Sequence, residues 1–239
     1  MLNVKQAGGH QLIKGDGKHI YKPTKLTEVI FYTKYLPKYP ELAPFVPKVS
    51  GSGKTKDIKE NFDDDQYKLI IEKCYNGYVK LENLMYHLRD DDYVLIDIKV
   101  GSILWCSDAT KEKIQHTKDK NKTSTVPKYK FRIDGMISKD LMIDKISGRQ
   151  LKINQVMDIF SRINAGAKTK IINWIDSAIP VLKEIPINFY GLSLFMVING
   201  DEVVVKFIDF VKYEEIRGKR LDDLVESLES VKSILNQSK

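Results

Sequence analysis

The segment "YVLIDIKVG", Tyr93 to Gly101, combines charged and apolar residues in a regular order. In it, Asp97 and Lys99 alternate with apolar residues, which is typical of a β-strand. Side chains two positions apart on a strand point to the same face, so both charged groups are expected to face one site. An ordinary ion pair at a sheet edge would give the same pattern.

Three further charged residues occur in the order expected of a phosphotransferase. Lys22 ends a predicted hairpin, and Glu28 lies on the predicted helix that follows, where it could hold the lysine outstretched. Asp209 ends an apolar strand, where a carboxylate is costly unless hydrogen bonds or a metal such as Mg²⁺ receive it. Taken singly, Lys22 could be a surface lysine and Asp209 a turn cap. Together with Asp97 and Lys99 they follow the chain order of a two-lobed kinase, although the H-R-D and D-F-G motifs of protein kinases are absent.

The first part of the chain is predicted to form a small antiparallel lobe. Residues 11–22 indicate a hairpin around Gly15-Asp16-Gly17, and a second hairpin is predicted within residues 66–84 at Asn76-Gly77. Between them a helix is expected after Thr24, a candidate N-cap. Its predicted apolar face comprises Leu26, Val29, Ile30 and Leu36.

The second part combines strands with longer helices. Helical patterns dominate residues 155–182, with Pro180 as an expected kink or break. A hairpin is predicted around Asn199-Gly200, and helical spacing recurs from Leu221 to Leu235. Antiparallel sheets in both lobes with flanking helices make this an α+β chain.

The run "VSGSGKT" at residues 49–55 invites comparison with a phosphate-binding loop. Such a loop needs a glycine five positions before Gly53, where this chain has Lys48, preceded by Pro47. We therefore expect a solvated loop here and no phosphate site.

Composition limits the classes of protein. The chain has 239 residues with 42% hydrophobic residues, enough for a core, and its apolar runs are too short to span a membrane. Met1 to His10 does not resemble a secretory signal, and the two cysteines, Cys74 and Cys106, have no metal-ligand spacing. A soluble cytoplasmic or nuclear protein is expected. A monomer is favoured, although the sequence leaves the oligomeric state open, and no heptad pattern long enough for a coiled coil is visible. The net charge of +7, mostly from lysine, indicates a polyanionic partner, unless the lysines only maintain solubility.

Several motifs in order resemble the inositol polyphosphate kinase family, whose signature is P-x-x-x-D-x-K-x-G. Here Asp97, Lys99 and Gly101 match it, with Tyr93 in place of the proline. Further matching segments run along nearly the whole chain: "AGGH" from Ala7, "FVPKVSG" from Phe45, "LENL" from Leu81, "FRIDGM" from Phe131, "DKISGRQL" from Asp144, "FYGLSLFMV" from Phe189 and "VKFIDF" from Val205. The resemblance implies a two-lobed kinase-like fold, related to ATP-grasp folds, with an ATP-binding lobe over residues 1–83 and a catalytic lobe over residues 84–239.

The resemblance also implies roles for individual residues. Lys22, supported by Glu28, is expected to contact ATP phosphates, together with Lys14, and backbone groups of Glu82 and Leu84 to hold adenine. Asp97 would orient or deprotonate the acceptor and Lys99 would hold a substrate phosphate. Asp209, with Ser193 nearby, would bind Mg²⁺. The family's Ile-Asp-Phe-Ala-His-Thr reads "IDFVKY" here, so no role passes to Lys212 or Tyr213.

The lysine-rich run from Ser107 to Thr125 resembles the inositol hexakisphosphate kinase branch, although it lacks that branch's glutamine. On a helix, Lys113, His116 and Lys120 would share a face and form a cationic wall within an inositol-phosphate-binding segment, residues 102–127. A solvated loop is the simpler alternative.

The function that the sequence predicts is ATP- and Mg²⁺-dependent phosphorylation of inositol hexakisphosphate to a diphosphoinositol pentakisphosphate, without nucleic acid as a partner. Phosphorylation of inositol tris- or tetrakisphosphate hydroxyls is the alternative within the class. A non-enzymatic basic module that binds nucleic acid or phosphoinositide membranes is the alternative from another class. That module would leave Asp97 and Asp209 without a role.

Overall fold

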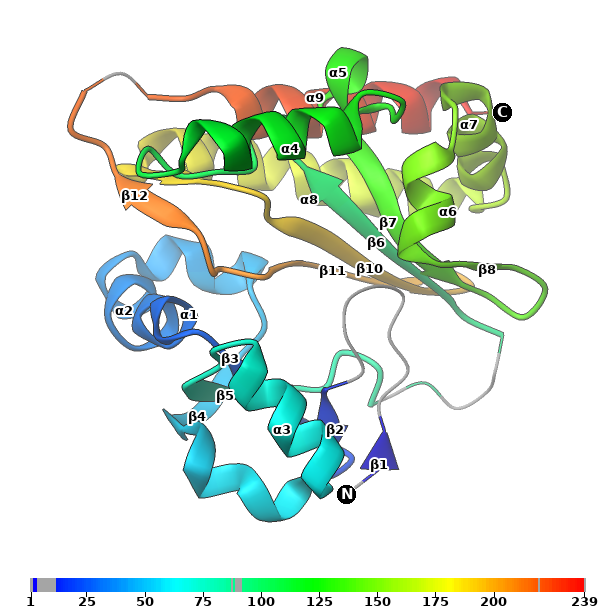
Figure 1. The fold of residues 1–239 in the computed structure, drawn as a ribbon. Coiled ribbons are helices and arrows are strands. Elements are labelled where there is room, and N and C mark those ends of the chain that lie inside the picture. The colour runs from blue at the N-terminus through cyan, green and yellow to red at the C-terminus, as the bar shows by residue number, and fades with distance from the viewer. Residues whose placement is uncertain (1, 4–11, 87, 89–91, 219, 239) are drawn as a thin grey trace.

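The computed structural model describes residues 2–3, 12–86, 88, 92–218 and 220–238. Two lobes lie one above the other, each built on its own antiparallel sheet (Figure 1). The expected two-lobed α+β kinase-like fold is thereby confirmed. The "AGGH" motif and Gln11, the first residue of the first predicted hairpin, lie outside the described residues.

The sheet of the N-terminal lobe has the strand order β1-β2-β3-β5-β4. Its strands are β1 (Leu2–Asn3), β2 (Lys14–Gly15), β3 (His19–Thr24), β4 (Val49–Lys54) and β5 (Gly77–Glu82). The predicted first hairpin is confirmed, because β2 pairs with β3 in the register Lys14 to Tyr21. Lys22 therefore lies on a central strand, opposite Val79.

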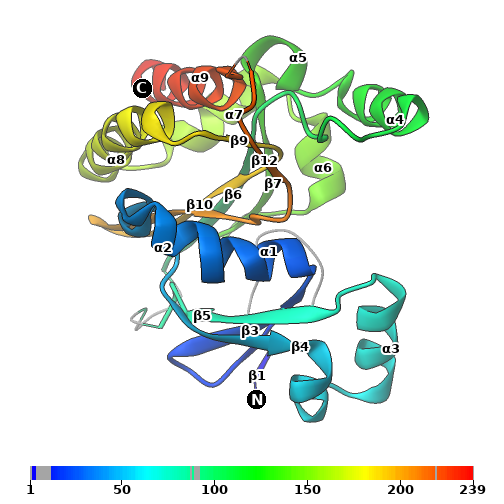
Figure 2. The ribbon, with the colours of Figure 1, turned by 90° about the vertical axis from the view of Figure 1, so that its left-hand side faces the viewer.

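The helix after β3 is less regular than its sequence pattern. It runs through α1 (Leu26–Ile30), a π-helical turn (Phe31–Tyr35) and α2 (Leu36–Lys38). Its buried side carries Glu28, Phe31 and Tyr32, whereas Leu26 is 45% exposed. The expected apolar face is wrong at Leu26, and the N-cap is Lys25 rather than Thr24. The helix lies between the two sheets (Figure 2).

The second predicted hairpin, at Asn76-Gly77, is wrong. Residues before it form a helix, α3 (Asp64–Glu72), because the Asp63 carboxylate caps it by accepting the Gln66 N–H at 2.8 Å. Gly77 instead permits close packing, since a Cβ there would lie 2.7 Å from Val29 Cγ2. The glycine thus marks the contact of α1 with β5 and no turn.

The "VSGSGKT" run is a strand and not the expected loop. Val49–Lys54 is β4, which pairs with β5, and a 3₁₀ helix (Thr55–Asn61) follows. A second 3₁₀ helix (Pro40–Phe45) precedes it. The expected absence of a phosphate loop is consistent with this extended backbone, because a strand cannot wrap its N–H groups around a phosphate.

The sheet of the C-terminal lobe has the order β11-β10-β6-β7-β8. Its strands are β6 (Val94–Val100), β7 (Phe131–Ile137), β8 (Met142–Ile143), β10 (Ser193–Asn199) and β11 (Glu202–Ile208). β6, which carries Asp97 and Lys99, lies at the centre between β10 and β7. The β10–β11 pairing confirms the hairpin predicted around Asn199-Gly200. A separate pair joins β9 (Ile187–Phe189) to β12 (Tyr213–Glu215).

Helices cover the face of this sheet that points away from the N-terminal lobe (Figure 1). The helices of this lobe are α4 (Lys111–Asn121), α5 (Val126–Tyr129), α6 (Lys145–Gln150), α7 (Ile153–Ser161), α8 (Ala165–Glu184) and α9 (Asp223–Gln237), of which α4 lies to one side of the sheet (Figure 2). The expected break at Pro180 is wrong, because this exposed proline lies inside α8, on the side where water can satisfy the freed carbonyl. No helix of the described chain is long and apolar enough to cross a membrane.

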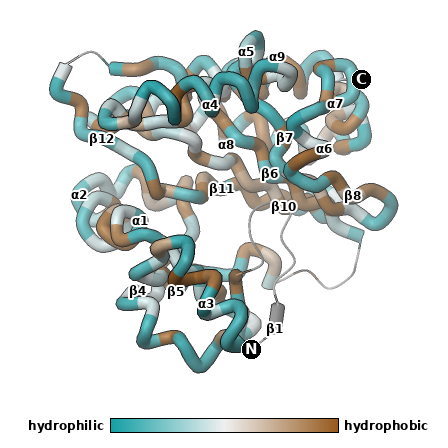
Figure 3. Tube along the Cα trace, viewed as in Figure 1, coloured by the Kyte–Doolittle hydropathy of each residue, from teal (hydrophilic) through white to brown (hydrophobic). Residues whose placement is uncertain are grey.

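One continuous core connects the lobes. Phe31 and Phe210 stack at 3.9 Å between ring centroids, and they belong to the same buried cluster as Ile96 and Ile98 of β6. By contrast, α4 is hydrophilic along almost its whole length (Figure 3). The lobes are therefore held together by apolar packing, whereas α4 lies on the periphery.

Candidate active site

A cavity of about 400 Å³ lies between the lobes. β3 and the segment after β5 line one side of it, and β6, β7 and the end of β11 line the other. The predicted residues that it brings together are Lys22, Glu28, Glu82, Leu84, Asp97, Lys99 and Asp209.

Lys22 is held by two carboxylates, one from each lobe. Its ammonium donates to Glu28 Oε1 at 2.9 Å and to Asp209 Oδ1 at 2.7 Å. Burial alone would lower the pKa of Lys22, but the charges of Asp209 and Glu28 outweigh it and hold this pKa well above its usual range. The predicted pairing with Glu28 is therefore present, and Lys22 stays charged.

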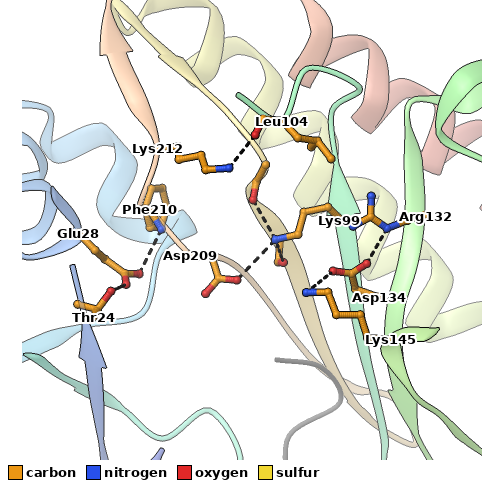
Figure 4. Close-up of polar contacts among 12 residues, drawn as sticks. Thr24, Glu28, Lys99, Leu104, Arg132, Asp134, Lys145, Asp209, Phe210 and Lys212 are labelled. Atoms are coloured by element: carbon orange, nitrogen blue, oxygen red, sulfur yellow. Dashed lines mark hydrogen bonds and ion pairs between the residues drawn. The ribbon is translucent and has the colours of Figure 1, made fainter. Parts of the chain in front are cut away.

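Glu28 is fully buried and also fixes the backbone beside Asp209. Its carboxylate accepts the Phe210 N–H at 3.1 Å and the Thr24 hydroxyl (Figure 4). Buried carboxylates need such donors to offset lost hydration. One side chain of the N-terminal lobe thus sets the position of the chain that follows β11.

Asp209 has a left-handed backbone, with φ of 70°, which is uncommon for a residue with a Cβ. Strained backbone of this kind concentrates at functional sites. Lys99 Nζ lies 3.5 Å from Asp209 Oδ2, so each carboxylate oxygen faces one lysine. Burial would raise the pKa of Asp209, but Lys22 and Lys99 outweigh it and hold the pKa well below its usual range.

Lys99 reaches the cavity from the centre of the sheet. Its ammonium also donates to the Gly191 carbonyl at 2.9 Å and to Ser193 Oγ at 2.8 Å. Ser193 is fully buried and does not line the cavity. In this structure Ser193 positions Lys99, and its expected proximity to a metal remains a prediction.

Asp97 is a buried carboxylate that lines the cavity. Its side chain faces the same site as Lys99, as the alternation in β6 predicts, and within the described chain its Oδ1 atom has no hydrogen-bond partner. Burial raises the pKa of Asp97 to about 6, with Lys99 acting in the opposite direction and Asp209 and Asp134 adding to the rise. A carboxylate with a raised pKa and a free oxygen is suited to accept a proton from a bound acceptor.

A polar network beside Asp97, built on the buried Arg132 and Asp134, was not predicted. Arg132 Nε donates to Asp134 Oδ1 at 2.7 Å, and Lys145 Nζ lies 3.2 Å from Asp134 Oδ2 (Figure 4). Arg132 also donates to Asn121 Oδ1, at the end of α4, at 2.7 Å. The signal was present in "FRIDGM", where Arg132 and Asp134 lie two apart on a strand like Asp97 and Lys99.

Two further lysines line the cavity without a carboxylate partner among the described residues, Lys25 and Lys212. Lys212 Nζ donates to the Leu104 carbonyl at 2.8 Å. Burial, then the nearby Lys113, lowers the pKa of Lys212. A neighbouring anion would relieve this repulsion, which makes Lys212 a candidate phosphate ligand that the sequence did not assign.

The predicted cationic wall is helical but lies outside the cavity lining. Lys113, His116 and Lys120 are exposed on one side of α4, with Lys113 close enough to influence Lys212. The expected helix is therefore present in place of the alternative loop. Contact of these three residues with a substrate remains a prediction.

Of the other predicted nucleotide ligands, Glu82 and Leu84 line the cavity and Lys14 does not. The Lys14 ammonium lies 6.0 Å from the centre of the Phe62 ring. The Glu82 N–H donates to the Lys48 carbonyl at 2.9 Å, which leaves the Glu82 carbonyl and the Leu84 backbone as groups that could meet a base. Both residues line the cavity.

The donor set fits a hydrated Mg²⁺ ion. Mg²⁺ binds through one or two carboxylates and substrate phosphates while it keeps several waters. Asp209, partly exposed to the cavity, supplies an ionised carboxylate, and it lies close enough to Asp97 for its charge to raise the pKa of Asp97. Lys22 and Lys99 are placed to accept the negative charge of phosphates at the same point.

Fold and site together define a two-lobed kinase-like protein with a charged cavity between the lobes. The family model of inositol polyphosphate kinases matches residues 78–236. The chain therefore belongs to the inositol polyphosphate kinase family. A comparison with curated proteins gave no match.

Solved structures give the same fold. The inositol phosphate multikinase of S. cerevisiae, crystallised with ADP and Mn²⁺, matches with a TM-score of 0.70 and 21% identity, over 92% of this chain and 98% of its own. A second structure, from a study of the engineering of inositol phosphate multikinase, matches with a TM-score of 0.54 and 21% identity, over 66% of this chain and 84% of its own.

Proposed function

We propose that the protein is an ATP- and Mg²⁺-dependent inositol phosphate kinase that converts inositol hexakisphosphate to a diphosphoinositol pentakisphosphate. The observation that carries the kinase assignment is the free buried Oδ1 of Asp97 in the same cavity as Lys22, Lys99 and Asp209. Such a set can orient an acceptor, neutralise phosphates and hold a metal ion, which is what phosphoryl transfer requires. The match to a multikinase bound to ADP and Mn²⁺ supports nucleotide and divalent-metal use.

In this proposal the N-terminal lobe, residues 1–83, holds ATP. Lys22, kept in place by Glu28, neutralises ATP phosphates, and the backbone of Glu82 and Leu84 contacts adenine. Asp209 would hold Mg²⁺, which when bound supplies charge neutralisation on the transferred phosphoryl group.

The C-terminal lobe, residues 84–239, presents the acceptor. An acceptor oxygen attacks the γ-phosphorus in line, the bond to the ADP oxygen breaks, and any proton on the acceptor passes to Asp97. Lys99 holds a neighbouring substrate phosphate. The work of the protein is positioning and electrostatic stabilisation, with no covalent enzyme intermediate.

The choice of hexakisphosphate rests on the cations of segment 102–127. Lys113, His116 and Lys120 are exposed on one side of α4, and Lys212 lies near Lys113 at the cavity. A densely charged inositol gains more from such a surface than a sparsely phosphorylated one, because each added phosphate adds a charge-assisted contact.

The alternative acceptors are hydroxyls of inositol tris- or tetrakisphosphate. The observation that favours them is the fold similarity to two multikinase structures. A non-enzymatic basic module is disfavoured, because it gives no role to the buried Asp97 carboxylate, whose Oδ1 has no hydrogen-bond partner within the described chain.

The deciding experiment incubates the purified chain with Mg²⁺, labelled ATP and, separately, inositol tris-, tetrakis-, pentakis- and hexakisphosphate, and separates the products by charge. A labelled product more anionic than inositol hexakisphosphate is expected. If label appears only on the less phosphorylated inositols, the kinase assignment stands, but the acceptor is one of these inositol phosphates and not inositol hexakisphosphate. No label on any of them would refute the proposed function.

A further inference from the structure

The turn after β6 is held by a carboxylate from the far end of the chain. Asp223, in the first turn of α9, accepts the N–H groups of Ser102 at 2.7 Å and Ile103 at 2.9 Å through Oδ2. Its Oδ1 accepts the Ser102 hydroxyl. Gly101 has φ of 91°, and a Cβ there would lie 3.0 Å from Asp223 Oδ2, so a glycine is needed for this approach.

This carboxylate is shielded, and its charge is balanced. The Asp223 side chain is 11% exposed, and Lys130 Nζ lies 3.6 Å from Oδ1. Hydrogen bonds from backbone N–H groups to an ionised carboxylate are stronger than neutral ones. Removal of the carboxylate would leave two N–H groups of the turn without these partners.

Two more contacts hold the segment that runs from this turn to α4. The Leu104 carbonyl accepts from Lys212 at 2.8 Å, and Ser107 donates to Glu214 from its N–H at 2.8 Å and its hydroxyl at 2.7 Å. The three residues that make these contacts, Lys212, Glu214 and Asp223, all come from the C-terminal part of the chain. The segment from the charged strand β6 to α4 is thus fixed at three points by the C-terminal part of the chain.

The first of these points is the one nearest to Lys99 along the chain. Ser102 is three residues after Lys99, so a shift of the turn moves the end of β6 and the start of the segment that carries α4. Neither α4 nor this segment belongs to the lobe that would hold ATP. A displacement would therefore affect the acceptor side of the cavity and leave Lys22 and Glu28 in place.

We propose that Asp223 is a positioning residue that sets the place of segment 102–121 relative to Asp97 and Lys99, and thereby the affinity for the inositol phosphate. The proposal rests on the proposed function for its kinetic consequence. The contacts that it invokes do not depend on that function.

The kinetic test compares Asp223→Ala, Asp223→Asn and Asp222→Ala. Asp223→Ala is expected to raise the KM for the inositol phosphate about tenfold, because three charge-assisted hydrogen bonds are lost, while the KM for ATP changes less than about twofold. Asp223→Asn is expected to retain most of the affinity, since its amide oxygen can accept both N–H groups. Asp222 is exposed and makes no side-chain cap hydrogen bond to α9, so its alanine variant is the matched control. Equal changes in both KM values, or none, would overturn the proposal.

A second measurement does not need turnover. Hydrogen exchange of the backbone amides in residues 101–121 is expected to be faster in Asp223→Ala than in wild type and Asp222→Ala, and unchanged in residues 77–82. If Asp223→Ala does not fold, Ser102→Ala takes its place, because it removes one of the three hydrogen bonds. It is expected to speed exchange in residues 101–121 by a smaller factor and to leave exchange in residues 77–82 unchanged. Unchanged exchange in residues 101–121 would overturn the positioning role. Failure of the wild type to phosphorylate any inositol phosphate would refute the proposed function and leave the exchange result to decide the role of Asp223.

Discussion

The Lys22 ammonium donates to Asp209 Oδ1 at 2.7 Å across 187 positions of the chain. This contact joins a central strand of one lobe to the residue that follows β11 in the other. Lys99 faces the second oxygen of the same carboxylate at 3.5 Å. The residues expected to meet ATP, the metal ion and the acceptor are therefore connected through one aspartate.

Asp209→Asn is expected to lower turnover at least about 100-fold, because it removes the only charge of the proposed metal ligand. The measurement is the initial rate over a range of Mg²⁺ concentrations at fixed ATP. Glu202→Gln, at the exposed other end of β11, is the control and should keep the wild-type rate. A purified Asp209→Asn protein with wild-type rates would refute the assignment.

Charge reversal of Lys113 and Lys120 to glutamate is expected to raise the KM for the inositol phosphate at least about tenfold, with a much smaller effect on the KM for ATP. Both side chains lie on the exposed face of α4. Reversal of Lys56 and Lys68, exposed on the N-terminal lobe, changes the net charge equally and serves as the control. Similar effects on both substrates would show that α4 is not the substrate wall.

The rate is expected to fall as the pH drops below about 6. Burial raises the pKa of Asp97 to about 6, and only the ionised carboxylate can accept a proton or orient the acceptor as proposed. The measurement is kcat/KM between pH 5 and 8, with inositol phosphate and ATP each varied. A rate that stays constant down to pH 5 would contradict a role for ionised Asp97.

The same carboxylate is expected to cost stability. The pKa of Asp97 rises from 3.8 to about 6 on folding, because the folded protein favours the protonated form. The stability that protonated Asp97 contributes is therefore fully present below pH 3.8 and is lost as the pH rises through 6. Asp97→Asn should therefore raise the free energy of unfolding at pH 8 by about 2–3 kcal/mol, and the gain should largely vanish near pH 4. Urea unfolding at both pH values measures it. A variant less stable than wild type at pH 8 would contradict this account of burial.

Gly148→Ala is expected to destabilise the fold by about 1–3 kcal/mol, because a Cβ there would lie 2.3 Å from the Ile133 carbonyl oxygen. The clash would push α6, which carries Lys145, away from β7. Gly218→Ala, where a Cβ meets nothing within 4 Å, is the control in urea unfolding. Equal stability of the two variants would contradict the packing argument.

Sequence patterns predicted the elements whose signals are local. The alternation in β6 placed Asp97 and Lys99 on one face, and the hairpin around Asn199-Gly200 is present. Asn76-Gly77 has the same dipeptide but no hairpin, because the Asp63 cap forms a helix before it and α1 packs on Gly77. A dipeptide cannot reveal which distant element will approach it.

The network of Arg132, Asp134 and Lys145 was missed for a related reason. Each residue has an ordinary surface explanation in the sequence, and only the pairing of β7 beside β6 and the packing of α6 make them neighbours of Asp97. The buried face of the helix after β3 was misjudged because the side that turns inward carries Glu28, whose partners Lys22, Thr24 and Phe210 are not visible in the apolar spacing. Long-range partners are thus the part that periodicity cannot supply.

The three-point attachment of the segment after β6 also bears on biosynthesis. A ribosome releases β6 and α4 well before it releases Lys212, Glu214 and Asp223, so the nascent chain carries the acceptor side of the cavity without the residues that fix it. β10, which pairs with β6, is also made late. A chain that ends before Asp223 because of a premature stop codon should therefore lack an ordered segment between β6 and α4, while the sheet of the N-terminal lobe can still form.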